Sequence, residues 1–191
     1  MDLIARQLGS RPVKGGRHPA WGTHNALLSL GPRCYLEVIA PDPDNKKSAV
    51  QIPEVFSRSG SGTLSSWAAG VQDLSQRRST SDQRSPTLGG LIAGSRQKSD
   101  GGVLSWLLTD PMKSVMGGLV PFLIDWGDSD HPAAGLPSEC FLRALHLHHP
   151  EPELLGEALD ALGLSNLVEI KASSQASVVA LIESPRGIVE I

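Results

Sequence analysis

The chain has 191 residues, 40% of them apolar, and a formal net charge of −3 at pH 7. It contains no apolar run long enough to span a bilayer, which argues against a membrane protein. Its basic residues Arg77, Arg78 and Arg84 stand among serines and acids without interleaved aromatics, which argues against nucleic-acid binding. Gly and Pro are abundant and aromatic residues are few, a composition typical of many short strands joined by tight turns.

Residues 1–43 predict a short helix followed by a hairpin. Apolar residues at helical spacing end in Leu8–Gly9. A two-stranded hairpin is predicted over residues 25–40, where the turn at Pro32–Arg33 leads to Glu37 inside an apolar strand.

A polar, Ser- and Gly-rich loop is predicted for residues 44–62. A second module follows over residues 63–132, with a strand at 64–71 and a weak helix at 72–82. The two arms of its hairpin are residues 103–108 and 119–126.

A third module is predicted over residues 138–191. Residues 140–147 alternate as a strand does, and two prolines then open a helix that ends at Gly163. Residues 177–191 predict a second hairpin, with Glu190 in its last strand.

The two ends of the chain resemble each other. Gly31–Val38 and Ser184–Ile191 each hold a Pro-Arg turn followed by a Glu in an apolar strand, so the two hairpins are expected to share one register. The C-terminal copy has a strand before its helix, whereas Met1 runs directly into the first helix. The first module is therefore expected to lack its first strand. This predicts self-association through the N-terminal module as a homodimer, or a marginally stable chain.

Repeated modules of strand, helix and strands predict an α+β fold in one domain spanning residues 1–191, with a curved mixed sheet around a cavity. The chain opens without a signal sequence, and Cys34 and Cys140 lie in apolar strand patterns. Both observations favour buried reduced thiols and a cytoplasmic protein.

Three stretches together resemble the glyoxalase-like domain of the vicinal oxygen chelate (glyoxalase, bleomycin resistance and dioxygenase) superfamily. They are residues 15–28, residues 35–43, and residues 121–127 with His131–Pro132. The resemblance covers nearly the whole chain and implies βαβββ modules. It also implies that a first strand carrying a His is missing.

The resemblance further implies a divalent metal, Zn, Ni, Mn or Fe, that polarises adjacent oxygens of a substrate. Glu37 matches the strand position of a metal-binding Glu in glyoxalase I proteins, and Asp125 lies where those enzymes have a catalytic Glu. Ser66–Trp67 stands where a His ligand is expected. The ligand set that the family uses is therefore depleted in this sequence.

The candidate catalytic residues are Glu37, Asp125 and His24, and Glu37 is also the candidate metal ligand. Facing strands of paired modules are expected to bring Glu37 and Asp125 into one cavity. The candidate substrate-binding residues are His18, Trp21, Asn25, Trp67 and His131.

Each candidate also has a structural interpretation. Glu37 is either a cavity group or an edge-strand carboxylate in water, and Asp125 is either catalytic or a residue that ends a strand at a turn. His146 and His148 share one strand face that is interpreted as solvated, and His149 begins the next loop.

The sequence suggests two functions for this protein, both with a small molecule as its substrate or ligand. The first is a glyoxalase-like lyase or isomerase that acts through a metal-polarised or carboxylate-based cavity. The alternative is a metal-free binding module of the same fold, without turnover. A third hypothesis is an assembly protein whose exposed sheet edge pairs with another subunit.

Overall fold

The computed structural model describes residues 1–19, 21–44, 64–79, 88–97, 102–113 and 115–191. These form two compact units. The first unit comprises Met1–Ile52, His131–Arg143 and Ala180–Ile191, and the second comprises Pro53–Asp130 and Ala144–Val179. Apart from Asp44, the predicted loop at residues 44–62 lies outside the described residues.

The first unit contains helix α1 (Asp2–Leu8) and an antiparallel sheet of order β1-β2-β3. Ile4 and Leu8 bury the apolar side of α1, and Gly9 ends the helix in the left-handed conformation at φ 73°. The predicted first helix and its end are therefore confirmed. The strands are β1 (Val13–His18), β2 (Thr23–Ser29) and β3 (Tyr35–Pro41).

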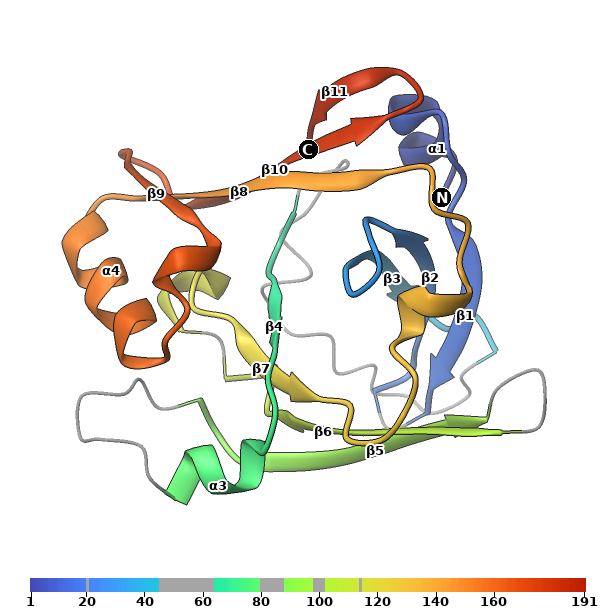
Figure 1. The fold of residues 1–191 in the computed structure, drawn as a ribbon, viewed down its shortest axis with the longest axis horizontal. Coiled ribbons are helices and arrows are strands. Elements are labelled where there is room, and N and C mark those ends of the chain that lie inside the picture. Colours follow the sequence, from blue (N-terminus) through green and yellow to red (C-terminus); the bar gives the residue numbers. More distant parts are fainter. Residues whose placement is uncertain (20, 45–63, 80–87, 98–101, 114) are drawn as a thin grey trace. The chain divides into compact units, whose positions relative to one another are not determined.

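The predicted hairpins both form, but they differ in register. The first joins β2 to β3, and the second joins β10 (Ser177–Ser184) to β11 (Gly187–Glu190). Figure 1 shows α1 lying beside the second hairpin, where the backbone of Gly9 meets the side chain of Arg186.

The turns of the two hairpins explain the difference in register. In the first hairpin the Leu30 N–H donates to the Cys34 carbonyl around a three-residue turn, whereas Ser184 pairs with Gly187 around a two-residue turn. Gly31 supplies the extra turn residue at φ 131°, a conformation that its repeat counterpart Ser184 does not adopt. The expectation of one shared register is therefore wrong by one residue. Because a one-residue shift exchanges the two faces of a strand, Glu37 and Glu190 are not equivalent.

The second unit contains a βαβββ module of sheet order β4-β7-β6-β5, in which β4 and β7 are parallel. Its elements are β4 (Ala68–Gly70), α3 (Leu74–Ser79), β5 (Leu91–Gln97), β6 (Val103–Thr109), the 3₁₀ turn η1 (Met116–Gly118) and β7 (Phe122–Asp125). The predicted arms at 103–108 and 119–126 correspond to β6 and β7, and the predicted strand at 64–71 is shorter than expected. The sequence analysis missed β5, whose composition passes from apolar to polar around Gly94.

The remaining elements are β8 (Phe141–His149), α4 (Pro152–Ala161), the 3₁₀ turn η3 (Ser165–Leu167) and β9 (Glu169–Ala172). Their sheet has the order β11-β10-β8-β9, with β8 and β9 parallel. This order differs from that of the second module, so the third module is not a structural copy of it. Leu155 and Leu159 of α4 are fully buried, and the helix packs on β9 (Figure 1).

The molecule is α+β, with few helices and with mixed and antiparallel sheets, as the sequence predicts. Within the described residues, no helix combines the length and the apolar character needed to cross a membrane.

Candidate functional site

A row of polar side chains lies on one face of the β1-β2-β3 sheet. Asn25 and Thr23 share a face of β2 because residues two apart on a strand point the same way. Glu37 on β3 is a diagonal neighbour of Asn25 on that face. This follows from the register, in which Leu27 pairs with Glu37 and Asn25 pairs with Ile39. His18 pairs with Thr23 and joins them from β1. We call His18, Thr23, Asn25 and Glu37 the polar row.

The side chain of Asn25 connects the polar row. Its Oδ1 accepts a hydrogen bond from the Gly16 backbone N–H at 2.7 Å, and its Nδ2 donates to Glu37 Oε1 at 2.7 Å. The same Nδ2 lies 3.5 Å from His18 Nε2. A backbone N–H can only donate, so Gly16 fixes which end of the amide is oxygen and directs the NH₂ group towards Glu37.

A β-bulge in β1 places the Gly16 N–H against Asn25. The register of β1 with β2 shifts between Lys14 and Arg17, which takes Gly15 and Gly16 out of the regular ladder. A Cβ on Gly15 would lie 2.1 Å from Asn25 Oδ1, so only glycine leaves room for the amide. Gly15 and Gly16 therefore lie inside a strand, although a glycine pair is more typical of a turn.

A tight turn positions His18 and Trp21. The N–H groups of Trp21 and Gly22 both donate to the His18 carbonyl, at 3.0 and 2.8 Å. The ring centroids of His18 and Trp21 are 5.8 Å apart, and His18 Nδ1 lies 3.0 Å from the buried Thr23 hydroxyl. The imidazole is thus held at one end of the polar row, next to an indole.

Tyr35 extends the same face of β3 towards His131. Tyr35 precedes Glu37 by two residues, and its ring centroid lies 5.6 Å from that of His131. His131 caps the 3₁₀ turn η2 (Pro132–Gly135), where its Nδ1 accepts a hydrogen bond from the Ala133 N–H at 3.2 Å. Burial lowers the pKa of His131, and the nearby Arg33 lowers this pKa further. A neutral imidazole therefore stands beside Tyr35.

His24 lies on the opposite face of the sheet from the polar row. It pairs with Arg17 on β1 and with Ala40 on β3, and it follows Thr23 by one position. The structure thus brings together Glu37, His18, Trp21 and Asn25 from the predicted set, but not His24. The catalytic role of His24 stays a prediction, and the His24 side chain does not share a sheet face with the polar row.

Asp125 and Trp67 belong to the second unit, where their polar atoms hold local structure. Asp125 Oδ2 accepts from the Leu74 N–H at 3.1 Å at the start of α3, and its Oδ1 accepts from the Gly127 N–H at 2.9 Å. Trp67 Nε1 donates to the Leu119 carbonyl at 2.7 Å. These contacts favour the structural interpretation of Asp125. Its sharing of a cavity with Glu37 stays a prediction, because the two residues lie in different units.

The described residues do not provide a ligand set for a divalent metal. No group of three or more His, Cys, Asp or Glu side chains among them is arranged to hold an ion. Structural and catalytic zinc sites need at least three protein ligands, and in the polar row only His18 and Glu37 are of ligand type. The histidines of β8 have other partners: His146 pairs with Glu169 at 3.0 Å, and His148 contacts the Ser177 hydroxyl at 3.0 Å.

The sequence analysis missed Thr23, Tyr35 and Gly16 as members of this site. Thr23 and Asn25, and likewise Tyr35 and Glu37, are two apart in strands, so the period of a strand already places each pair on one face. The role of Gly16 depends on the bulge, which no short-range pattern specifies.

Comparisons with known proteins agree with this fold. The sequence model of a family described as a glyoxalase-like domain matches residues 1–163. Among solved structures, the chain is similar to a hypothetical protein from Staphylococcus aureus, with a TM-score of 0.63 and 14% sequence identity. That similarity covers 93% of this chain and 83% of the other, and it shows the fold. No curated protein matches the chain.

Proposed function

The chain belongs to the glyoxalase-like domain family of the vicinal oxygen chelate superfamily, and from this premise we propose a function for the polar row. It binds a small molecule with two adjacent oxygen-bearing carbons, and Glu37 moves a proton between those carbons. The activity is that of a glyoxalase-type isomerase or lyase. The observation that carries the proposal is the amide of Asn25, which is oriented by Gly16 and donates to Glu37 at 2.7 Å.

The polar row has unused hydrogen-bonding capacity for a ligand. Glu37 is exposed, and a carboxylate that accepts one hydrogen bond from Asn25 retains further acceptor sites. The Asn25 amide nitrogen makes a long contact of 3.5 Å with His18 Nε2, so a ligand oxygen can compete for its second N–H. A ligand that offers both a donor and an acceptor fits this pair.

Proton transfer follows from the same arrangement. The Glu37 carboxylate takes the proton from the carbon next to a carbonyl, and the electron pair of that C–H bond moves to give an enediolate. The Asn25 N–H donates to the oxygen on which negative charge develops. The proton of the substrate hydroxyl passes to that oxygen, the hydroxyl carbon becomes the new carbonyl, and Glu37 returns the first proton to the neighbouring carbon, so no atom is gained or lost. No step passes through a metal, because the described residues do not fit one.

Isomerisation of the hemithioacetal of an α-oxoaldehyde and a thiol tests the proposal. Glu37→Gln should lower kcat by about 100-fold or more and leave KM little changed, because the amide keeps the shape and the contact with Asn25 but cannot take a proton. The matched control is Glu190→Gln, which makes the same change at the repeat counterpart on β11 and should leave turnover intact. Proton exchange of the substrate C–H in D₂O, followed by NMR, reports the chemical step directly. Equal turnover in the wild type and Glu37→Gln would reject Glu37 as the base.

The second candidate function is binding without turnover. It is favoured by the lack of a three-residue metal group among the described side chains, since relatives often use a divalent metal to stabilise the enediolate. In that case the wild type binds the hemithioacetal in calorimetry, whereas neither isomerisation nor exchange in D₂O occurs. Asn25→Ala should then weaken binding by about fivefold to tenfold, since one to two hydrogen bonds are lost.

A further inference from the structure

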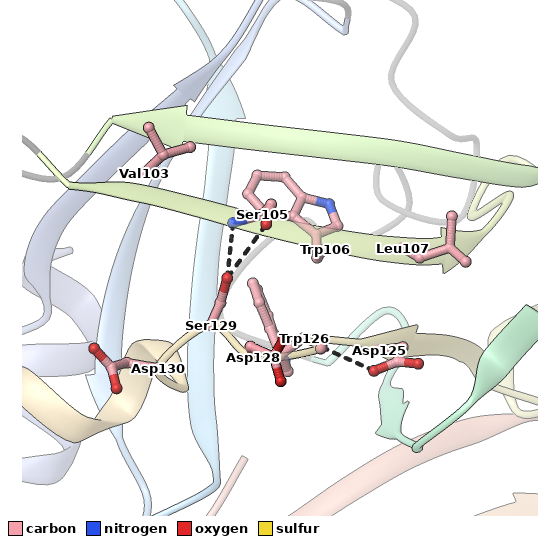
Figure 2. Close-up of a pocket in the computed structure, with 10 residues that line it drawn as sticks. Val103, Ser105, Trp106, Leu107, Asp125, Trp126, Asp128, Ser129 and Asp130 are labelled. Atoms are coloured by element: carbon pink, nitrogen blue, oxygen red, sulfur yellow. Dashed lines mark hydrogen bonds between the residues drawn. The ribbon is translucent and has the colours of Figure 1, made fainter.

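The second unit has a hollow formed by two tryptophan rings. Trp106 of β6 and Trp126, the residue after β7, have ring centroids 5.5 Å apart and ring planes tilted by 57° (Figure 2). The hollow has a volume of about 470 Å³ and is open to solvent. It shares no residue with the polar row.

The backbone fixes the two indoles in place. Gly94 on β5 pairs with Trp106, and a Cβ on Gly94 would lie 2.3 Å from the indole Cε2, so the ring lies over the glycine. Leu107 pairs with Asp125 on β7, which brings Trp126 across from Trp106. Both rings are half-buried, so part of their surface faces the hollow.

The charged side chains of the lining are acidic. Three carboxylates line the hollow, those of Asp125, Asp128 and Asp130, and none of the described lining residues is Lys, Arg or His. Asp128 and Asp130 are exposed and stand on the turn after Trp126. This turn is held by the Ser129 N–H, which donates to the Trp126 carbonyl at 2.9 Å, and by the Ser129 hydroxyl, which accepts from the Ser105 N–H at 3.1 Å.

We propose that this hollow binds a small organic cation with a methylated ammonium group. The negative face of an indole attracts a cation within about 6 Å of the ring centroid, and two indoles that meet at an angle can both face one such group. The carboxylates add long-range attraction and oppose anions. A quaternary ammonium such as that of choline donates no hydrogen bond and is weakly hydrated, so its transfer from water to a site between two rings costs little. A divalent metal does not suit the site, because no described cluster offers three ligands.

Titration of the full chain with choline tests the proposal, with indole N–H signals in NMR and tryptophan fluorescence as readouts. Choline should shift the signals of Trp106 and Trp126, and 3,3-dimethyl-1-butanol, its neutral isostere, should not. Trp126→Leu should weaken binding about fivefold, and Trp126→Phe by less, because Phe retains a ring. Asp128→Asn should weaken binding and reduce its salt dependence. Asp160→Asn, an equal charge change at an exposed site on α4 outside the lining, should leave binding unchanged.

Three results would overturn the proposal. The first is that choline leaves both indole signals unchanged. The second is that the neutral isostere binds as tightly as choline, which would make the hollow merely apolar. The third is that Asp128→Asn binds choline as the wild type does. Phosphocholine distinguishes a free cation from a lipid headgroup, because its phosphate should be repelled by the carboxylates and bind more weakly than choline.

Discussion

The surroundings of His131 favour its neutral form. It packs against the Tyr35 ring, caps η2 through Nδ1 and lies near Arg33, and burial followed by that positive charge lowers its pKa below the ordinary value of 6.5. The folded chain therefore takes up this proton at a lower pH than the unfolded chain does. Above pH 6.5 the contribution of His131 to stability is fully present, and it is lost as the pH falls through the lowered pKa.

His131→Asn should flatten this acid-side loss of stability. Asparagine is also a good helix-capping residue, so the variant removes the titration and keeps an acceptor for the Ala133 N–H. The difference in melting temperature between pH 7.5 and pH 5 should be smaller for the variant than for the wild type. Arg33→Gln is the companion variant, because loss of its positive charge should raise the pKa of His131 in an NMR titration. An unchanged pH difference in His131→Asn would show that other groups cause it.

The turn of each hairpin determines how closely the N-terminal and C-terminal hairpins match in strand register. The Pro-Arg motif correctly predicts two hairpins, and apolar spacing correctly predicts α1 and α4. The register of the first hairpin could not be predicted from that motif, because Gly31 enlarges the turn by adopting a positive φ. The bulge at Gly15–Gly16 was missed for a similar reason. A glycine pair is compatible with a turn or a bulge, and only the tertiary contact with Asn25 distinguishes them.

Helix α4 buries one of two adjacent leucines and exposes the other. Leu155 is fully buried, whereas its neighbour Leu154 is 51% exposed. Leu155→Ala should lower the free energy of unfolding by about 2 to 5 kcal/mol, because it removes buried methyl groups and leaves a cavity. Leu154→Ala is the matched control, and its effect should stay within about 0.5 kcal/mol. Chemical denaturation followed by circular dichroism measures both, and equal losses would contradict the packing of this helix.

For the molecule as a whole, the sequence predicts the fold class and the family more fully than the site. Patterns of strands, helices and turns are local, and the quoted segments carry the family resemblance, which the family match over residues 1–163 confirms. A site depends on which side chains meet, and here two faces of one sheet separate Glu37 from His24, which lies one residue before the predicted hairpin. The self-association, the cytoplasmic setting and the single domain predicted from the sequence stay predictions.

We expect the stability of the whole chain not to depend on a divalent metal. Among the described residues, His18 and Glu37 are the ligand-type side chains of the polar row, and the amide of Asn25 already occupies Glu37 Oε1. We therefore expect dialysis against EDTA to leave the melting temperature unchanged. Added Zn, Ni, Mn or Fe should raise the melting temperature by less than binding of the same metal at a specific, tight site would raise it. A ligand at 100 times its Kd stabilises a fold by about 2.7 kcal/mol, so a tight site would be evident as a large shift in melting temperature.

Elemental analysis of the purified protein provides an independent measure of bound metal. Stoichiometric metal that survives dialysis, and whose removal lowers the melting temperature, would show that the chain completes a ligand set beyond the polar row. The same result in Glu37→Gln would show in addition that Glu37 is not one of the ligands.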